Sequence, residues 1–341
     1  MNNTTHSIDP CSLRFYPSVL SFCVLLAVVG IPGNGLILYI YTKKINIPII
    51  SFFIKVLVIL NLVGTSCLLP VFMHIVLNPD TKDGLFLCSW FSFGQHFFGL
   101  NTGLLYIVIA GQRYRKICKH GQAQLKEQGA KKILLGCTLF SVVSCSPNAL
   151  ITTAKKQNVT VSSKEQCWTS VCYFSANERA NHIATLYTSW AIFELIAIFV
   201  TLVVFYSLIS KHIGLHKRTL KRMSISSRSQ VKVTNPTIIF FSLTVIFLVS
   251  SAPRVLQTLY YSVVPEDPAI SANIHYVHDV IIMLPFINCI VNPFVFGFTS
   301  KVFRHQLILL MRVNVKRRKP FSVPPDIRLS AESIMPMRIY S

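Results

Sequence analysis

Acidic residues are scarce in this chain. Asp and Glu together account for 12 of the 341 residues, against 33 Lys and Arg, which gives a formal net charge of +21. Hydrophobic residues make up 52% of the sequence, and the mean hydropathy is +0.53. A soluble chain of this length could form two domains, but this apolar content favours a membrane protein.

The motifs of common enzyme classes are also missing. The sequence has no metal-binding His-Glu-x-x-His, no nucleophile elbow and no phosphate-binding loop. We therefore expect no enzyme activity, no metal and no cofactor. No internal repeat is visible, which argues against the duplicated architecture of many transporters. The pattern Gly30-x-x-Gly33-x-Gly35 lies in an apolar stretch, where it indicates close packing of helices.

Seven apolar stretches are long enough to cross a bilayer, which takes about 20 residues of helix. None shows the short-period alternation of polarity that marks a transmembrane barrel. The sequence therefore predicts an all-α membrane protein, with a seven-transmembrane helix bundle over residues 18–299. The predicted spans are 18–41, 49–77, 85–112, 133–153, 183–210, 237–264 and 277–299.

Basic residues are concentrated in every second gap between these stretches. Four segments, 43–55, 113–132, 211–232 and 301–341, hold 26 of the 33 Lys and Arg but only three of the 12 acidic residues. Loops rich in Lys and Arg stay in the cytoplasm, so the pattern predicts a multi-pass plasma-membrane protein with an extracellular N-terminus. Because the positive charge is confined to one side, we expect contacts with anionic membrane lipid and cytoplasmic partners, and none with nucleic acid.

The extracellular side carries three glycosylation sequons. Residues 1–17 form an extracellular tail in which Asn2 and Asn3 are acceptors, and they lack the basic start of a cleavable signal peptide. The third acceptor, Asn158, lies in the outer loop 154–182, whose β-branched residues predict a hairpin. All three sequons fall on the side that the charge pattern places outside.

The cytoplasmic end carries two further segments. Residues 300–312 place apolar side chains at helical spacing with basic ones opposite, which predicts a short amphipathic eighth helix in the membrane interface. Residues 313–341 have the basic and proline-rich composition of a disordered cytoplasmic tail.

Four of the ten cysteines fall on the extracellular side, where disulfides persist. The others lie inside spans or in the cytosol and are expected to be reduced. Four extracellular cysteines leave the pairing open. They are Cys11, Cys88, Cys167 and Cys172.

Polar residues inside the predicted spans are costly and call for a role. The triplet Gln112-Arg113-Tyr114 closes the third span, Pro253 interrupts the sixth, and Asn292-Pro293-x-x-Phe296 closes the seventh. Asparagines recur in the first, second and seventh spans, at Asn34, Asn61, Asn288 and Asn292. Together these markers resemble the rhodopsin-like family of G-protein-coupled receptors over residues 18–312.

The resemblance implies a receptor that converts binding of an extracellular ligand into activation of a heterotrimeric G protein. In that family the residues matching the four asparagines form a polar core that rearranges on activation, and the residue matching Arg113 meets the G protein. The cysteine at the outer end of the third span bonds to the outer loop, which here implies a disulfide between Cys88 and Cys167. The segment 112–119 looks most like that of invertebrate orphan and peptide-type receptors.

The chain departs from the family pattern at several switch positions. Gln112 stands where the family usually has an acid that pairs with the arginine, Asn61 replaces an aspartate, and Phe296 replaces a tyrosine. The segment before Pro253 lacks the usual Cys-Trp pair. These departures imply a loosely locked resting state or weak coupling, so a chemosensory or decoy receptor with little G-protein coupling is one alternative. A membrane transporter or channel is the alternative from another class.

The expected ligand is a peptide, and a small lipid or odorant-like molecule is the alternative. Amine receptors of this family carry an acid where Gln95 stands, and opsins carry a lysine where Phe286 stands, so neither class is expected. Glu194 and Arg254 are charged residues at similar depth in adjacent spans, which favours either a structural ion pair or a pair of ligand contacts. The residues expected to line the pocket are Gln95, Glu194, Arg254, Gln257, Trp168 and Asp279.

Overall fold

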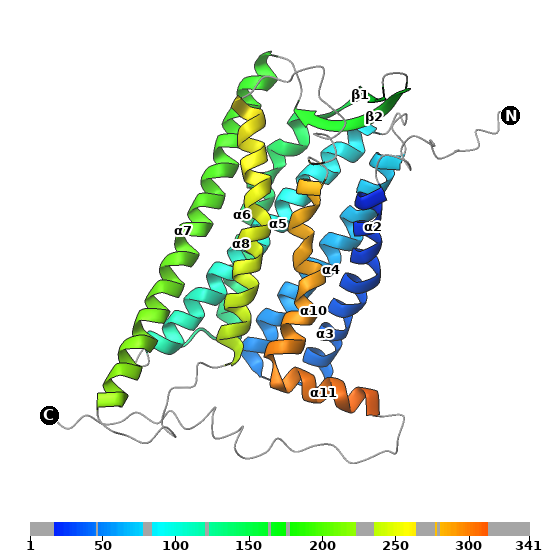
Figure 1. Ribbon diagram of the computed structural model, residues 1–341. Coiled ribbons are helices and arrows are strands. Elements are labelled where there is room, and N and C mark those ends of the chain that lie inside the picture. The colour runs from blue at the N-terminus through cyan, green and yellow to red at the C-terminus, as the bar shows by residue number, and fades with distance from the viewer. Residues whose placement is uncertain are drawn as a thin grey trace.

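A bundle of long helices forms the body of the computed structural model (Figure 1). The structure describes residues 17–45, 47–77, 84–119, 123–162, 165–174, 178–222, 235–263, 277 and 280–312. The first span consists of α2 (Pro17–Leu25), a π-helical turn (Leu26–Gly30) and α3 (Ile31–Lys43). The next five are α4 (Pro48–Leu77), α5 (Gly84–Cys118), α6 (Glu127–Ile151), α7 (Glu178–Arg222) and α8 (Asn235–Val263). The seventh ends in a 3-10 turn (Leu284–Phe286) and α10 (Ile287–Thr299), after which α11 (Lys301–Arg312) follows.

Membrane-length helices account for all seven predicted spans. Within the described residues, six segments are both long enough and apolar enough to cross a membrane. The exception is the 35-residue α5, whose length suffices but whose apolar character is interrupted by Gln95, His96 and Asn101. The predicted all-helical seven-span bundle with a short eighth helix is therefore confirmed.

Helix α5 lies at the centre of the bundle. It packs against α4, α6, α7 and α8, and it also contacts both strands of the outer loop. Those strands, β1 (Thr152–Ser162) and β2 (Glu165–Phe174), form the predicted antiparallel hairpin, in which Val159 pairs with Cys167. The hairpin lies across the end of the bundle opposite to α11 (Figure 1).

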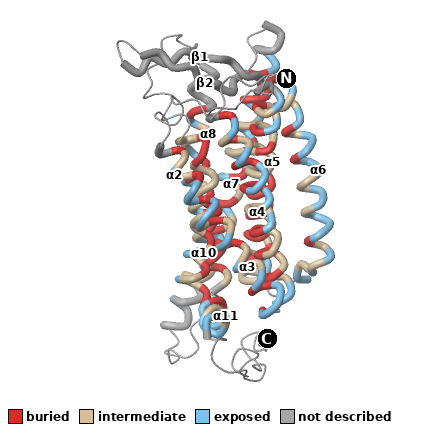
Figure 2. The backbone as a smooth tube through the Cα atoms, turned by 90° about the vertical axis from the view of Figure 1, so that its right-hand side faces the viewer, coloured by how far each residue is buried: buried red, intermediate tan, exposed pale blue. Residues whose placement is uncertain are grey.

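The buried side chains face the bundle axis, whereas large apolar side chains cover its outside. The interior is filled by residues such as Leu105, Tyr106 and Phe240, all with no exposed surface. The outer face of α6 shows the opposite pattern, with Val143 at 72% and Leu150 at 86% exposure, and Figure 2 shows most of this helix exposed. Apolar surface on this scale is stable only against lipid tails.

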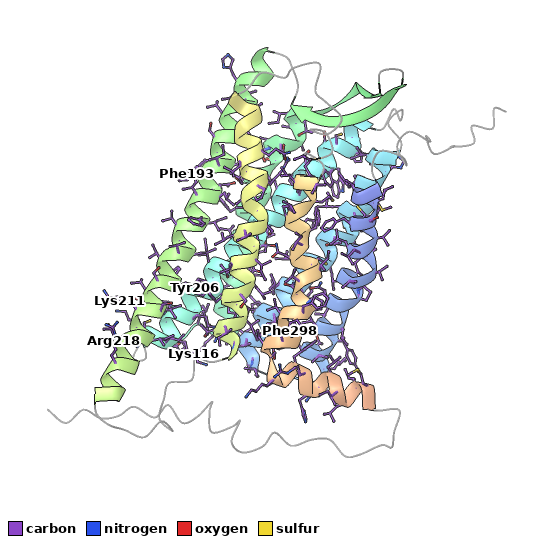
Figure 3. All side chains as sticks on the ribbon, in the orientation of Figure 1. Lys116, Phe193, Tyr206, Lys211, Arg218 and Phe298 are labelled. Atoms are coloured by element: carbon purple, nitrogen blue, oxygen red, sulfur yellow. The ribbon has the colours of Figure 1, made fainter. Side chains whose placement is uncertain are left out.

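Basic side chains of the described helices gather at one end. Figure 3 shows Lys116, Lys211 and Arg218 toward the end of the bundle that carries α11. Helix α7 is 45 residues long and continues past the neighbouring helices at this end (Figure 1). The charge asymmetry predicted from the sequence is therefore present in the fold, and it marks this end as cytoplasmic.

Ser300 starts the eighth helix. Its hydroxyl accepts a bond from the Phe303 backbone N–H at 3.1 Å, which caps the first turn of α11. The buried Phe303 ring stacks on Tyr41 at 6.5 Å and lies 6.0 Å from the ring of Phe296. These contacts fix α11 to the ends of α3 and α10, and Ile308, Leu309 and Met311 remain exposed on its surface.

Two glycines let the first and seventh spans touch. A Cβ atom at Gly33 would lie 2.3 Å from Pro293 Cγ, and one at Gly30 would lie 2.9 Å from Cys289 Sγ. The predicted close packing is therefore confirmed at both positions. A Cβ atom at Gly35 would meet nothing within 4 Å, so the third glycine of the pattern has no such role.

Candidate signalling and ligand sites

Asparagines of α3 and α10 form a hydrogen-bonded core where the two glycines bring these helices together. Asn34 Nδ2 donates to the backbone oxygens of Gly30 at 2.8 Å and Cys289 at 2.6 Å. Asn292 Nδ2 donates to Asn34 Oδ1 at 3.1 Å. Asn34 and Asn292 have no exposed surface. Each of these hydrogen bonds therefore satisfies a polar group that has no access to water inside the membrane.

The other two predicted core residues, Asn288 and Asn61, lie on α10 and α4. Asn288 Nδ2 donates to Ser250 Oγ at 3.3 Å, which ties α10 to α8 three residues before Pro253. Asn61 Nδ2 is buried and has no partner, and the same holds for the Oδ1 atoms of Asn288 and Asn292.

Arg113 lies at the cytoplasmic end of α5 and is 1% exposed. Among the described residues its Nε and Nη2 atoms have no hydrogen-bond partner, and its guanidinium lies 5.5 Å from the ring centre of Phe240 on α8. Gln112 beside it is also buried, and its Oε1 has no partner. Within the described part of the chain, the arginine thus faces an aromatic ring and forms no ion pair with an acid.

Two further switch residues, Tyr114 and Phe296, make aromatic contacts, and a hydrogen bond joins α7 to α8 near the same end. Tyr114 packs on Phe205 of α7 with ring centres 5.8 Å apart. Tyr206 and Thr244 share a hydrogen bond of 3.3 Å between α7 and α8. Phe296 is fully buried, with its ring edge-on to Tyr41 at 5.6 Å, so the absent tyrosine hydroxyl is replaced by apolar packing.

Several of the expected pocket residues form hydrogen bonds in the outer half of the bundle, either between helices or within one helix. Gln95 Nε2 donates to the Ile282 carbonyl at 2.6 Å and so joins α5 to the seventh span. Arg254 Nη1 donates to Gln257 Oε1 at 2.9 Å on α8. Two other expected pocket residues, Trp168 and Asp279, have side chains outside the described part of the chain.

The predicted bond between Glu194 and Arg254 is wrong. Glu194 Oε2 lies 3.2 Å from His96 Nε2, and Ser144 Oγ donates to Glu194 Oε1 at 2.5 Å. Counting residues along two helices gives the depth of each side chain but not its direction around the helix axis. Glu194 faces α5 and α6, and Arg254 bonds along its own helix.

The acid belongs to a polar cluster that the sequence analysis missed. The indole Nε1 of Trp190 donates to Ser144 Oγ at 2.6 Å, and the Tyr187 hydroxyl bonds to His96 Nδ1. Each of these residues is a polar group within a predicted span, which was the signal available in the sequence. We call His96, Ser144, Tyr187, Trp190 and Glu194 the outer polar cluster.

Cys88 anchors the outer end of α5. It is buried and disulfide-bonded, whereas Cys23, Cys67 and Cys289 are free thiols in the spans. The side chains of Cys167 and Cys172 are outside the described residues, as are those of Asn2, Asn3 and Asn158. A disulfide at Cys88 is therefore confirmed, and its pairing with Cys167 stays a prediction.

We expect Cys88→Ser to lower the stability of the purified protein by about 2–4 kcal/mol, because the disulfide no longer restrains the unfolded chain. Differential scanning fluorimetry measures this as a lower Tm, and Cys67→Ser, which removes a free thiol, is the control. Cys167→Ser is expected to match Cys88→Ser. Peptide mapping that finds Cys88 bonded to Cys172 would contradict the pairing.

A comparison with protein families gives the class of this bundle. Residues 33–296 match the family model described as 7 transmembrane receptor (rhodopsin family). The match covers more than half of the chain, so the chain belongs to this family. A sequence search of curated proteins gave no match.

Family membership settles the general activity. The chain is a G-protein-coupled receptor of the plasma membrane that recognises a ligand and signals through a G protein, and it is not an enzyme. Arg113, the asparagine core and the outer polar cluster lie at successive depths along one bundle.

Proposed function

We propose that this receptor binds an extracellular peptide in the outer half of the bundle and passes the signal to a heterotrimeric G protein through Arg113. The observation that carries the proposal is the buried Arg113, whose Nε and Nη2 atoms have no hydrogen-bond partner in the described part of the chain. A buried, unpaired hydrogen-bonding group costs about 1–3 kcal/mol, and more for a charged one. A cytoplasmic partner that offers acceptors to this guanidinium would therefore bind favourably.

The outer end of the bundle supports a peptide as the ligand. The β1–β2 hairpin contacts α4, α5 and α7 and so places an extended backbone beside the helix ends. Gln95, Arg254 and Gln257 are neutral or basic, and hydrogen bonding by such groups suits a peptide backbone and carboxylate better than an amine. We propose these three residues as ligand contacts, with Trp168 and Asp279 from the outer segments. Glu194, also proposed as a pocket residue, bonds to His96 of α5 and Ser144 of α6.

A ligand screen tests the proposal. Cells that express the receptor are exposed to a peptide library and, in parallel, to amine and lipid libraries, while second-messenger output is recorded. Responses to peptides that weaken with Gln95→Ala or Gln257→Ala at equal surface level support the peptide pocket. Responses confined to lipids contradict it, and ligand binding without any second-messenger change favours the decoy alternative.

We expect Gln112→Glu to lower basal signalling. An acid beside Arg113 supplies a charge-assisted hydrogen bond, whereas the amide oxygen of Gln112 is buried without a partner. A gain of about 1.4 kcal/mol in the resting state lowers the active fraction roughly tenfold. Basal second-messenger output measures this effect, with Gln124→Glu as a control at an exposed position near the same end. Unchanged output in Gln112→Glu would show that position 112 does not restrain the arginine.

A further inference from the structure

One tyrosine hydroxyl is buried between the helices without a hydrogen bond. Tyr106 of α5 has no exposed surface, and its Oη atom has no hydrogen-bond partner among the described residues. Its ring packs on Phe247 of α8, with ring centres 5.3 Å apart. A buried hydroxyl that makes no hydrogen bond lowers stability, and the lipid core offers it no water. This arrangement of the helices therefore carries a cost that another arrangement of the same helices could remove.

A second tyrosine hydroxyl lies nearby, on α7. Tyr206 is 8% exposed and belongs to the half of α7 nearer to α11 (Figure 3). It shares a hydrogen bond of 3.3 Å with Thr244 Oγ1 of α8, which is longer than the range of about 2.5–3.0 Å usual for two hydroxyls. Tyr206 is also close enough to Tyr106 and to Arg113 to influence each electrostatically. The bond to Thr244 is therefore a weak one, and an alternative partner lies close by.

The facing sides of α5 and α8 correspond around this point. On α8, Phe240, Thr244 and Phe247 are buried and lie on one face at helical spacing. The ring of Phe240 lies 5.5 Å from the guanidinium of Arg113, and Phe247 contacts Tyr106. Thr244 lies between these two contacts and bonds to α7. The hydroxyl on α7 and the hydroxyl of Tyr106 therefore belong to one layer in which three helices meet.

We propose that Tyr106 is a positioning residue for signalling, which takes over the hydrogen bond of Tyr206 when the receptor enters its signalling state. In the structure described here, the Tyr206 hydroxyl joins α7 to α8 through Thr244. In the signalling state this bond is broken, and the Tyr206 hydroxyl bonds to Tyr106 of α5. No proton is transferred, because one hydroxyl donates and the other accepts. Helix α8 is thereby released from α7 at this point, and the buried hydroxyl of Tyr106 gains a partner.

The exchange leaves none of the three hydroxyls without a bond. A threonine hydroxyl on a helix can donate to the carbonyl four residues earlier in the same helix, as Thr102 and Thr138 do at 2.8 and 3.0 Å. Thr244 therefore has a partner available after Tyr206 leaves. A tyrosine hydroxyl lies too far from its own backbone for such a bond, so Tyr106 depends on a side chain from another helix.

Basal activity of the purified receptor measures the effect without any ligand. The receptor is placed in lipid vesicles, and nucleotide exchange is recorded on a panel of purified heterotrimeric G proteins. Tyr106→Phe removes the hydroxyl and keeps the ring on Phe247, and we expect it to lower the exchange rate about tenfold, which corresponds to about 1.4 kcal/mol. Thr244→Val removes the present partner of Tyr206 and is expected to raise the rate. Tyr39→Phe, at an exposed position on α3, is the control and should match the wild type.

Two further measurements separate this role from ordinary packing. Tyr106→Phe should have no effect in a receptor that already carries Tyr206→Phe, because the hydroxyl that it would bond to is then absent. Tyr106→Phe alone should also keep or raise the Tm, since it removes a buried hydroxyl that has no partner in the described part of the chain. A variant that damaged the packing of α5 would lower the Tm instead.

Three outcomes would overturn the proposal. The first is a Tyr106→Phe exchange rate equal to that of the wild type. The second is an effect of Tyr106→Phe that persists at full size in the Tyr206→Phe receptor, because the hydroxyl would then act on another group. The third is a Tm that falls in Tyr106→Phe. If the wild-type rate is at background, Thr244→Val decides, because a rate that stays at background in this variant contradicts the exchange.

Discussion

Arg113→Ala should abolish G-protein signalling while leaving the receptor at the cell surface. Arg113 is almost fully buried, and its Nε and Nη2 atoms lack partners, so its removal eliminates an unpaired charge and costs mainly the contact with Phe240. Alanine is also the best helix former. Folding is therefore expected to be unchanged or improved. The G protein, however, loses the guanidinium donors that it would bind.

The measurement pairs agonist-stimulated and basal second-messenger output with surface labelling. Lys132→Ala serves as the control, because Lys132 is an exposed cation at the cytoplasmic end of α6. We expect a fall in output to background for Arg113→Ala, and no change for Lys132→Ala. Intact output in Arg113→Ala would mean that coupling does not pass through this arginine.

Gly33→Ala should strongly destabilise the bundle, although it adds only a methyl group. The new Cβ would lie 2.3 Å from Pro293 Cγ and 3.0 Å from Pro293 Cβ. A proline ring cannot rotate out of the way, so α3 and α10 must separate. Overpacking of this kind costs about 1–3 kcal/mol, which corresponds to a fall in Tm of roughly 5 °C in a protein of this size. The bond between Asn292 and Asn34 is weakened by the same displacement.

Gly35→Ala is the matched control on the same helix, two residues away. A Cβ atom there meets no other atom within 4 Å, so its Tm should equal that of the wild type or exceed it slightly. Tm and surface expression are measured for both variants. Equal values for Gly33→Ala and Gly35→Ala would show that the first and seventh spans adjust without cost.

Hydrophobicity predicted where helices cross the membrane but not where they end. The second span was expected at 49–77, and α4 is Pro48–Leu77, because both ends coincide with changes in polarity. The fifth span was expected at 183–210, yet α7 runs from Glu178 to Arg222. Its continuation is rich in Lys, Arg and Leu, which are good helix formers in water, so the backbone stays helical beyond the lipid. The π-helical turn Leu26–Gly30 has no comparable signal in the sequence.

For the sites, the sequence predicted which residues matter better than which of them meet. The asparagines and Arg113 were recognised from their cost inside a membrane, and the structure brings Asn34 and Asn292 into contact. The partner of Glu194 was predicted wrongly, because the expectation paired two charged residues at similar depth and did not include His96, which can be neutral. Choosing between them requires the rotation of each helix, which depends on packing across the whole bundle.

Helix α7 is long enough that a small tilt of its axis moves its cytoplasmic end by several ångströms. Glu194 fixes the helix to α5 and α6 in its outer part, and the helix ends at Arg222. The 28 residues between them extend about 42 Å at 1.5 Å per residue. A tilt of α7 by about 5° around Glu194 would displace its cytoplasmic end by roughly 4 Å, which is more than twice the rise of one residue. A displacement of that size at the cytoplasmic tip would change the surface that the helix offers to a protein docked under the membrane.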